Sequence, residues 1–166
     1  MEKIKKAYYY FFYKIYKSIE YTSELVGGAF WTDFKAGLVI GALEIWFLIS
    51  IGIYLVLITN KNIAELTLTQ PIVFIPLIII LLLNYFSFIH TDKWKEYNNE
   101  FDQLSIKKNK IGGKIVWCTV VFIIINLFFS YYLLLMRAKR NHTGPYSKEY
   151  IHQQKVKDSI SGAKYK

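Results

Sequence analysis

Three long apolar stretches constrain this chain more than any other feature of its sequence. They cover residues 36–59, 72–90 and 115–136, and they contain one Asp, Glu, Lys or Arg side chain, Glu44. At about 1.5 Å rise per residue, the first and third exceed a hydrocarbon core of about 30 Å, and the second lies near the lower limit. The sequence therefore predicts an all-α integral membrane protein with three transmembrane helices.

The segments outside the spans are predicted to lie at the membrane surface. Residues 1–35 form a leader with apolar and aromatic side chains at helical spacing and lysines opposite, which predicts an N-terminal interfacial amphipathic helix. Residues 91–105 predict an amphipathic helix that extends the second span, and residues 106–114 predict a turn rich in Lys and Gly. Residues 36–136 form one membrane domain, and we expect the basic tail, residues 137–166, to be disordered.

The basic charge of the chain lies outside the three spans. The net charge is +9, and only two of the 21 basic residues are arginines. We expect anionic lipid headgroups and the bilayer as the partners of this charge, and not nucleic acid, for which no base-reading fold fits between the spans. Aromatic residues gather at the span ends, as in an aromatic belt. The predicted interface anchors are Lys14, Lys17, Trp31, Trp94, Arg137 and Arg140.

The distribution of Lys and Arg gives a weak indication of orientation. Six precede the first span and six lie between the second and third, against one between the first and second. This pattern favours a cytoplasmic N-terminus, but the eight basic residues of the tail oppose it. Alternatively, the short second stretch, which contains Pro76, enters and leaves the membrane on one side.

Glu44 is the most unusual side chain of the spans, because a charged group in a bilayer costs several kcal/mol. Steps of three and four residues place it on one helical face with Gly37, Gly41 and Gly52, so a GxxxG motif and a buried carboxyl coincide. Polar residues of the other spans are its candidate hydrogen-bond partners and, with that face, the candidate packing or pore residues. They are Asn84, Ser87, Thr119, Asn126 and Ser130.

Three interpretations of Glu44 follow. We expect the protonated carboxyl to join Asn84 or Asn126 and hold the helices together. Alternatively, it binds a cation or relays a proton, although such sites usually gather several ionisable groups. In the third interpretation, the Glu44 residues of an oligomer surround a central pore.

The sequence predicts no catalytic, cofactor-binding or metal-binding residues, and we do not expect an enzyme. The single cysteine, Cys118, excludes an intramolecular disulfide and a cysteine metal site. No metal-ligand spacing, phosphate-binding glycine loop or nucleophile with a plausible base is present.

The layout resembles that of small multi-span proteins of the bacterial inner membrane, a resemblance that implies no activity. It depends on WTDFKAG before the first span, DKWKEYNNEF after the second and KNKIGG before the third. The leading hypothesis is a non-enzymatic accessory or anchoring subunit that binds copies of itself or another membrane protein. The alternatives are an oligomeric pore-forming or membrane-perturbing effector, for example in bacterial defence, and a small ion- or proton-coupled transporter.

Overall fold

The computed structural model describes residues 2–26, 31–60 and 70–163, and within these ranges the secondary structure is helical with no strands. Three of the helical stretches found there are long and apolar enough to cross a membrane: Thr32–Thr59, Pro71–Phe88 and Ile106–Tyr146. The helices are α1 (Glu2–Val26), α2 (Thr32–Thr59), α3 (Pro71–Asn84), α4 (Lys93–Asp102), α5 (Ile106–Arg140) and α6 (Lys148–Ala163), with a π-helix η2 (Tyr85–Ile89) and a 3-10 helix η3 (Gly144–Tyr146).

The helices differ in extent from the apolar stretches that predict them. α2 begins at Thr32, before the stretch at 36–59, and residues 61–69, between α2 and α3, lie outside the described residues. α5 begins at Ile106, so the turn predicted over 106–114 is wrong and its two glycines are helical. α4 is shorter than the amphipathic helix predicted over 91–105.

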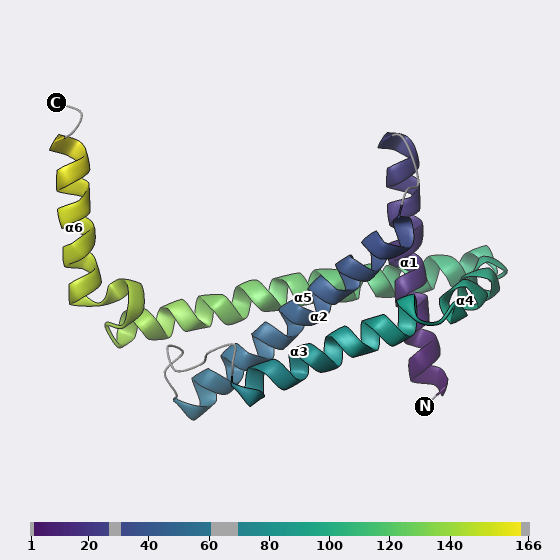
Figure 1. The fold of residues 1–166 in the computed structure, drawn as a ribbon, viewed down its shortest axis with the longest axis horizontal. Coiled ribbons are helices and arrows are strands. Elements are labelled where there is room, and N and C mark those ends of the chain that lie inside the picture. Colours follow the sequence, from purple (N-terminus) through teal and green to yellow (C-terminus); the bar gives the residue numbers. More distant parts are fainter. Residues whose placement is uncertain (1, 27–30, 61–69, 164–166) are drawn as a thin grey trace. The chain divides into compact units, whose positions relative to one another are not determined.

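The chain forms two compact units, residues 1–127 and 128–166. In the first unit, α2 and α3 run in opposite directions beside each other (Figure 1). α1 runs across the end of this pair where α2 begins and α3 ends, and it packs against α2 and α4. α1 and α4 therefore form a layer at one end of the spans.

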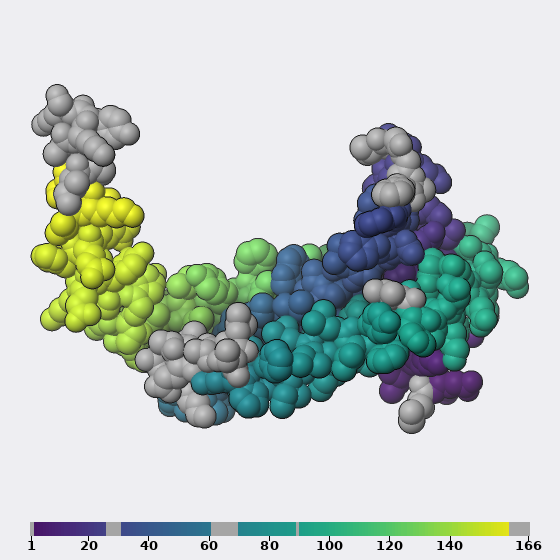
Figure 2. Space-filling model, viewed as in Figure 1, coloured from purple at the N-terminus to yellow at the C-terminus, as the bar shows by residue number. Residues whose placement is uncertain are grey.

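An aromatic layer holds α1, η2 and α4 together. The Phe12 and Phe88 rings stack with centroids 4.1 Å apart, and Tyr9 stacks on Tyr97 at 4.5 Å. Phe12 is 0% exposed. The apolar face of α1, predicted to lie on lipid, thus packs against the protein, whereas residues 2–7 at its N-terminal end are exposed and protrude in Figure 2. The buried members of the layer are Tyr9, Phe12, Tyr13, Phe88, Trp94 and Phe101.

The π-helix η2 ends the second span. Such a turn holds one residue more than an α-helical turn, which rotates the side chains that follow it. Phe88 of η2 is buried against α1, and the Thr91 hydroxyl donates to the Phe86 carbonyl at 3.0 Å. The wider turn is located where the apolar helix gives way to the aromatic layer.

The second unit contains the end of α5, η3 and α6. The tail predicted to be disordered, residues 137–166, instead contains the last turn of α5, η3 and α6, a helix of 16 residues. Residues 148–159 are exposed throughout. Their helical conformation therefore arises from local hydrogen bonds and the Pro145 turn that precedes them, rather than from a buried face.

Candidate functional site

The Glu44 carboxyl joins three helices of the first unit. The Tyr8 hydroxyl of α1 donates to Glu44 Oε1 at 2.9 Å, and Asn84 Nδ2 of α3 donates to Glu44 Oε2 at 2.5 Å. Each carboxyl oxygen of this α2 residue therefore accepts a hydrogen bond from a different helix. We refer to Tyr8, Glu44 and Asn84 as the Glu44 junction.

The polar atoms around the junction are only partly satisfied. Asn84 Nδ2 also donates to the Ile80 carbonyl at 3.0 Å, but Asn84 Oδ1 is buried without a hydrogen-bond partner among the described residues. Burial, and then the charge of Glu44, raise the pKa of Tyr8. Tyr8 therefore remains a neutral donor to the carboxyl at every physiological pH.

Apolar packing brings Tyr8 to Glu44. The face of α2 that contacts the aromatic layer has Ala36 at 0%, Ile40 at 1% and Leu43 at 5% exposure. Glu44 follows at the edge of that face and is half-buried. A carboxyl in this position needs hydrogen-bond donors, because burying an unpaired charge costs far more than burying a paired one.

The other predicted partners lie elsewhere. Asn126 accepts a hydrogen bond from Tyr54 at 2.8 Å and thereby joins α5 to α2 away from the junction. Thr119 donates to the Ile115 carbonyl of its own helix, and the Ser87 carbonyl lies 3.5 Å from the Tyr9 hydroxyl. Ser130 belongs to the second unit, where its side chain is buried. Of the predicted partners, the structure thus brings only Asn84 to Glu44.

The glycines of α2 do not make the close helix contact predicted from their spacing. A Cβ atom added at Gly37, Gly41 or Gly52 would meet no described atom within 4 Å. The close approach is found instead at Gly112 of α5, where an added Cβ would lie 2.7 Å from the Tyr10 Cζ atom. Within one chain, there is therefore space beside each of these three glycines, although Glu44 on the same face is engaged by α1 and α3.

A second polar cluster, which the sequence analysis missed, connects α1, α4 and α5. The Tyr10 hydroxyl donates to Asn109 Oδ1 at 3.1 Å, and Asn109 Nδ2 donates to the Tyr13 hydroxyl at 3.3 Å. Tyr13 in turn donates to Asp102 at 2.8 Å, and Asp102 pairs with Lys17 at 3.4 Å. We refer to these residues as the Asn109 network. The available signal was the tyrosine-rich face of the leader, whose hydroxyls need partners when buried.

The predicted anchors on α1 and α4 contact the protein. Trp94 is 7% exposed and packs against Phe12 with ring centroids 5.4 Å apart, so its prediction as a lipid anchor is wrong. The Lys14 amine lies over the Tyr10 and Tyr13 rings, and burial lowers its pKa.

The remaining anchors lie near helix ends or in ion pairs. Lys17 pairs with Glu20 as well as Asp102. Trp31 is exposed at the start of α2 in a left-handed conformation with φ of 55°. Arg137 and Arg140 occupy the last turn of α5, where basic side chains complement the helix dipole.

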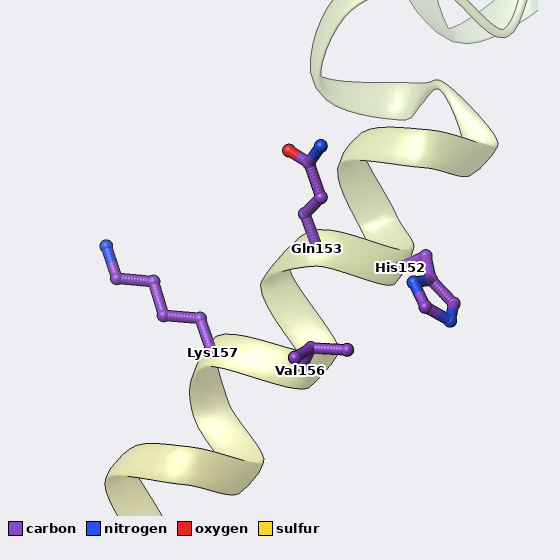
Figure 3. Close-up of a pocket in the computed structure, with 4 residues that line it drawn as sticks. All are labelled: His152, Gln153, Val156 and Lys157. Carbon is purple, nitrogen blue, oxygen red and sulfur yellow. The ribbon is translucent and has the colours of Figure 1, made fainter.

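The helix α6 has a shallow hollow on its surface. It is lined by four side chains of this one helix, His152, Gln153, Val156 and Lys157. Figure 3 shows Gln153 and Lys157 pointing to one side of the helix and His152 and Val156 to the other. The four side chains do not converge on a common point and form no binding site.

The chemistry of the Glu44 junction is hydrogen bonding between helices, since both oxygens of its carboxyl are engaged. In the part of the chain that the structure describes, no group of three or more His, Cys, Asp or Glu side chains could hold a metal ion. Comparison of the chain with protein-family models, curated proteins and solved structures finds no match.

Proposed function

We propose that this protein is an accessory or anchoring subunit of the bacterial inner membrane. Its spans would hold the α1–α4 layer at the membrane surface, and the open faces of the spans would contact a partner protein or a second copy. The observation that supports this function most strongly is the Glu44 junction, where the carboxyl of the first apolar stretch, residues 36–59, connects the surface helix to α2 and α3.

The surfaces of the spans support the same proposal. None of the residues of α3 is buried within the chain, and α2 has space beside Gly37, Gly41 and Gly52. Small residues on a membrane helix allow close approach of another helix. Gly41 lies three residues before Glu44 and has space beside it, so a partner helix could approach α2 at this position.

The N-terminus is proposed to be cytoplasmic. α1, α4 and the start of α5 lie at one end of the α2–α3 pair, and together they hold most of the lysines that precede α2 or lie between the spans. A basic layer is favoured on the cytoplasmic side, where anionic lipids attract it.

The test is the mass of the protein in lipid nanodiscs, measured by native mass spectrometry, together with conductance across planar bilayers. We compare wild type with Gly41→Leu and, as a matched control, Ala42→Leu at the next, exposed position. A monomer or dimer without conductance supports an anchoring subunit. A ring of four or more copies that conducts ions, and that only Gly41→Leu disrupts, would replace this proposal with the pore.

A partner is sought with a photocrosslinking amino acid at position 41 in living cells. One discrete adduct with another membrane protein, or with a second copy, supports the proposal. Adducts with lipid alone, in cells that express the protein at its native level, contradict it.

A further inference from the structure

The contact between α1 and α2 marks where the hydrocarbon of the bilayer can begin. The buried positions of α2 in this contact run from Ala36 to Leu43, seven residues and about 10 Å apart along the helix axis. That length equals the diameter of a helix, about 10–12 Å, so α1 covers this stretch of α2. α1 also contains Lys14 and Lys17, the latter in ion pairs, which belong at headgroup level.

The second span is bounded by α1 in the same way. The π-helix η2 lies against α1, because Phe88 stacks on Phe12 and the Ser87 carbonyl lies near the Tyr9 hydroxyl. Only α3, Pro71–Asn84, remains beyond this contact. Its last residue, Asn84, bonds to Glu44, which directly follows the buried stretch of α2 and also accepts a hydrogen bond from Tyr8 of α1.

The helical length left for the hydrocarbon is therefore short. α2 retains residues 44–59, about 24 Å at 1.5 Å per residue, and α3 retains 14 residues, about 21 Å. Both values fall below the average hydrocarbon thickness of about 30 Å, and any tilt of the helices shortens them further.

Aromatic and polar side chains lie at both ends of the helical length that remains for the hydrocarbon. Trp46 of α2, two residues after Glu44, is 39% exposed, and Tyr85, the first residue of η2 and next to Asn84, is 45% exposed. Exposed Trp and Tyr side chains are typical of the membrane interface. At the other end of the pair, Thr59 and Asn60 close α2, and Gln70 precedes α3.

We propose that the α2–α3 pair resides in bilayer whose hydrocarbon is only about 20–24 Å thick, with Glu44 at its boundary on the α1 side. The partner of this surface is lipid with short acyl chains, or lipid that the protein thins. Glu44 then meets the edge of the bilayer and not its centre, which removes most of the cost of a carboxyl in a span.

The first experiment measures depth with nitroxide spin labels. The exposed native thiol is removed by Cys118→Ser, and a label is attached to Trp46→Cys or, about 13 Å further along α2, to the matched exposed position Leu55→Cys. We expect the label at 46 to be accessible to a water-soluble relaxation agent and the label at 55 to favour oxygen. Equal burial of both labels in hydrocarbon would overturn the proposal.

The second experiment uses the wild-type chain and needs no variant to fold. The protein is reconstituted in vesicles of phosphatidylcholine with 14:1, 18:1 or 22:1 chains, each with the same fraction of phosphatidylglycerol. A mismatch between helix length and hydrocarbon thickness costs a fraction of a kcal/mol per Å. Helices that are several Å too short for the thicker bilayer therefore predict a folded-to-unfolded ratio at least about tenfold higher in 14:1 than in 22:1 lipid. A ratio that is constant, or highest in 22:1 lipid, would refute the proposal.

Discussion

Gly112→Ala tests the packing of α1 on α5 at one position. The added Cβ would lie 2.7 Å from the Tyr10 Cε1 and Cζ atoms, too close for the ring to remain in place. The ring is held by its hydroxyl bond to Asn109 and by an edge contact with Phe101 at 5.0 Å. Loss of each costs about 1 kcal/mol, and alanine in a helix returns about 1 kcal/mol over glycine. With the strain of displacement, we expect a net destabilisation of about 1–2 kcal/mol.

Gly113→Ala is the matched control in the same turn. Its added Cβ would lie 3.5 Å from the Lys14 Cε atom, an ordinary van der Waals contact. The higher helix propensity of alanine should therefore stabilise the protein by up to about 1 kcal/mol, which separates the two variants by about 2–3 kcal/mol.

The assay is titration with sodium dodecyl sulfate in dodecyl maltoside micelles, followed by tryptophan fluorescence. In a Tyr10→Ala background, Gly112→Ala should become stabilising, because the ring that it displaces is gone. If the two glycine variants have the same midpoint, or if Tyr10→Ala leaves the effect of Gly112→Ala unchanged, the reasoning from this contact is wrong.

Three further predictions use the same titration. Glu44→Gln should lower the free energy of unfolding by less than about 1 kcal/mol, because its amide can donate to Tyr8 and accept from Asn84. Glu44→Leu should lower it by about 2–4 kcal/mol, because these donors are left without an acceptor. Equal losses of stability in the two variants would contradict the structural role of the carboxyl. Phe12→Ala should cost about 3–5 kcal/mol, because this ring is fully buried, and the half-buried Phe11→Ala distinctly less; similar losses would contradict the packing of α1. Burial is the main cause that raises the pKa of five tyrosines of α1 above 10.0, so the unfolded chain loses these phenolic protons at lower pH than the folded protein. The stability that they contribute is therefore complete below pH 10 and is lost as the pH rises further. An unfolding midpoint that stays unchanged between pH 8 and 11, with tyrosinate absorbance at 295 nm as the monitor, would contradict this. These tyrosines are Tyr8, Tyr9, Tyr10, Tyr13 and Tyr16.

The spans and the surface helix were predictable because each is encoded by one continuous segment of the sequence. An uninterrupted apolar stretch has few alternatives to a membrane helix, and α2 ends at Thr59 where its stretch ends. The surface helix followed from helical periodicity, but its contacts did not. The same apolar face could lie on lipid or on protein, and only the positions of the spans decide that Phe12 meets Phe88.

The site was predictable only in part, for a related reason. A carboxyl in a span needs a donor, and Asn84 was among the few candidates. Tyr8 was not among the candidates, because it lies in α1. The point at which α1 crosses α2 depends on the complementary shapes of several aromatic rings. The importance of Gly112 was equally hidden, since a glycine next to a glycine and between lysines is typical of a turn.

The order in which the chain is synthesised has a consequence for α1. Tyr8, Tyr9 and Tyr10 contact residues that follow them by 36, 78 and 99 positions. At about 5–20 residues per second, the first helix emerges from the ribosome several seconds before its last partner, Asn109, exists. The α2 residues that cover its aromatic face are made first, Phe88 follows, and Asn109 comes last. The packing of α1 is therefore completed in stages, and the Tyr10 hydroxyl bond to Asn109 can form only after the chain has reached α5.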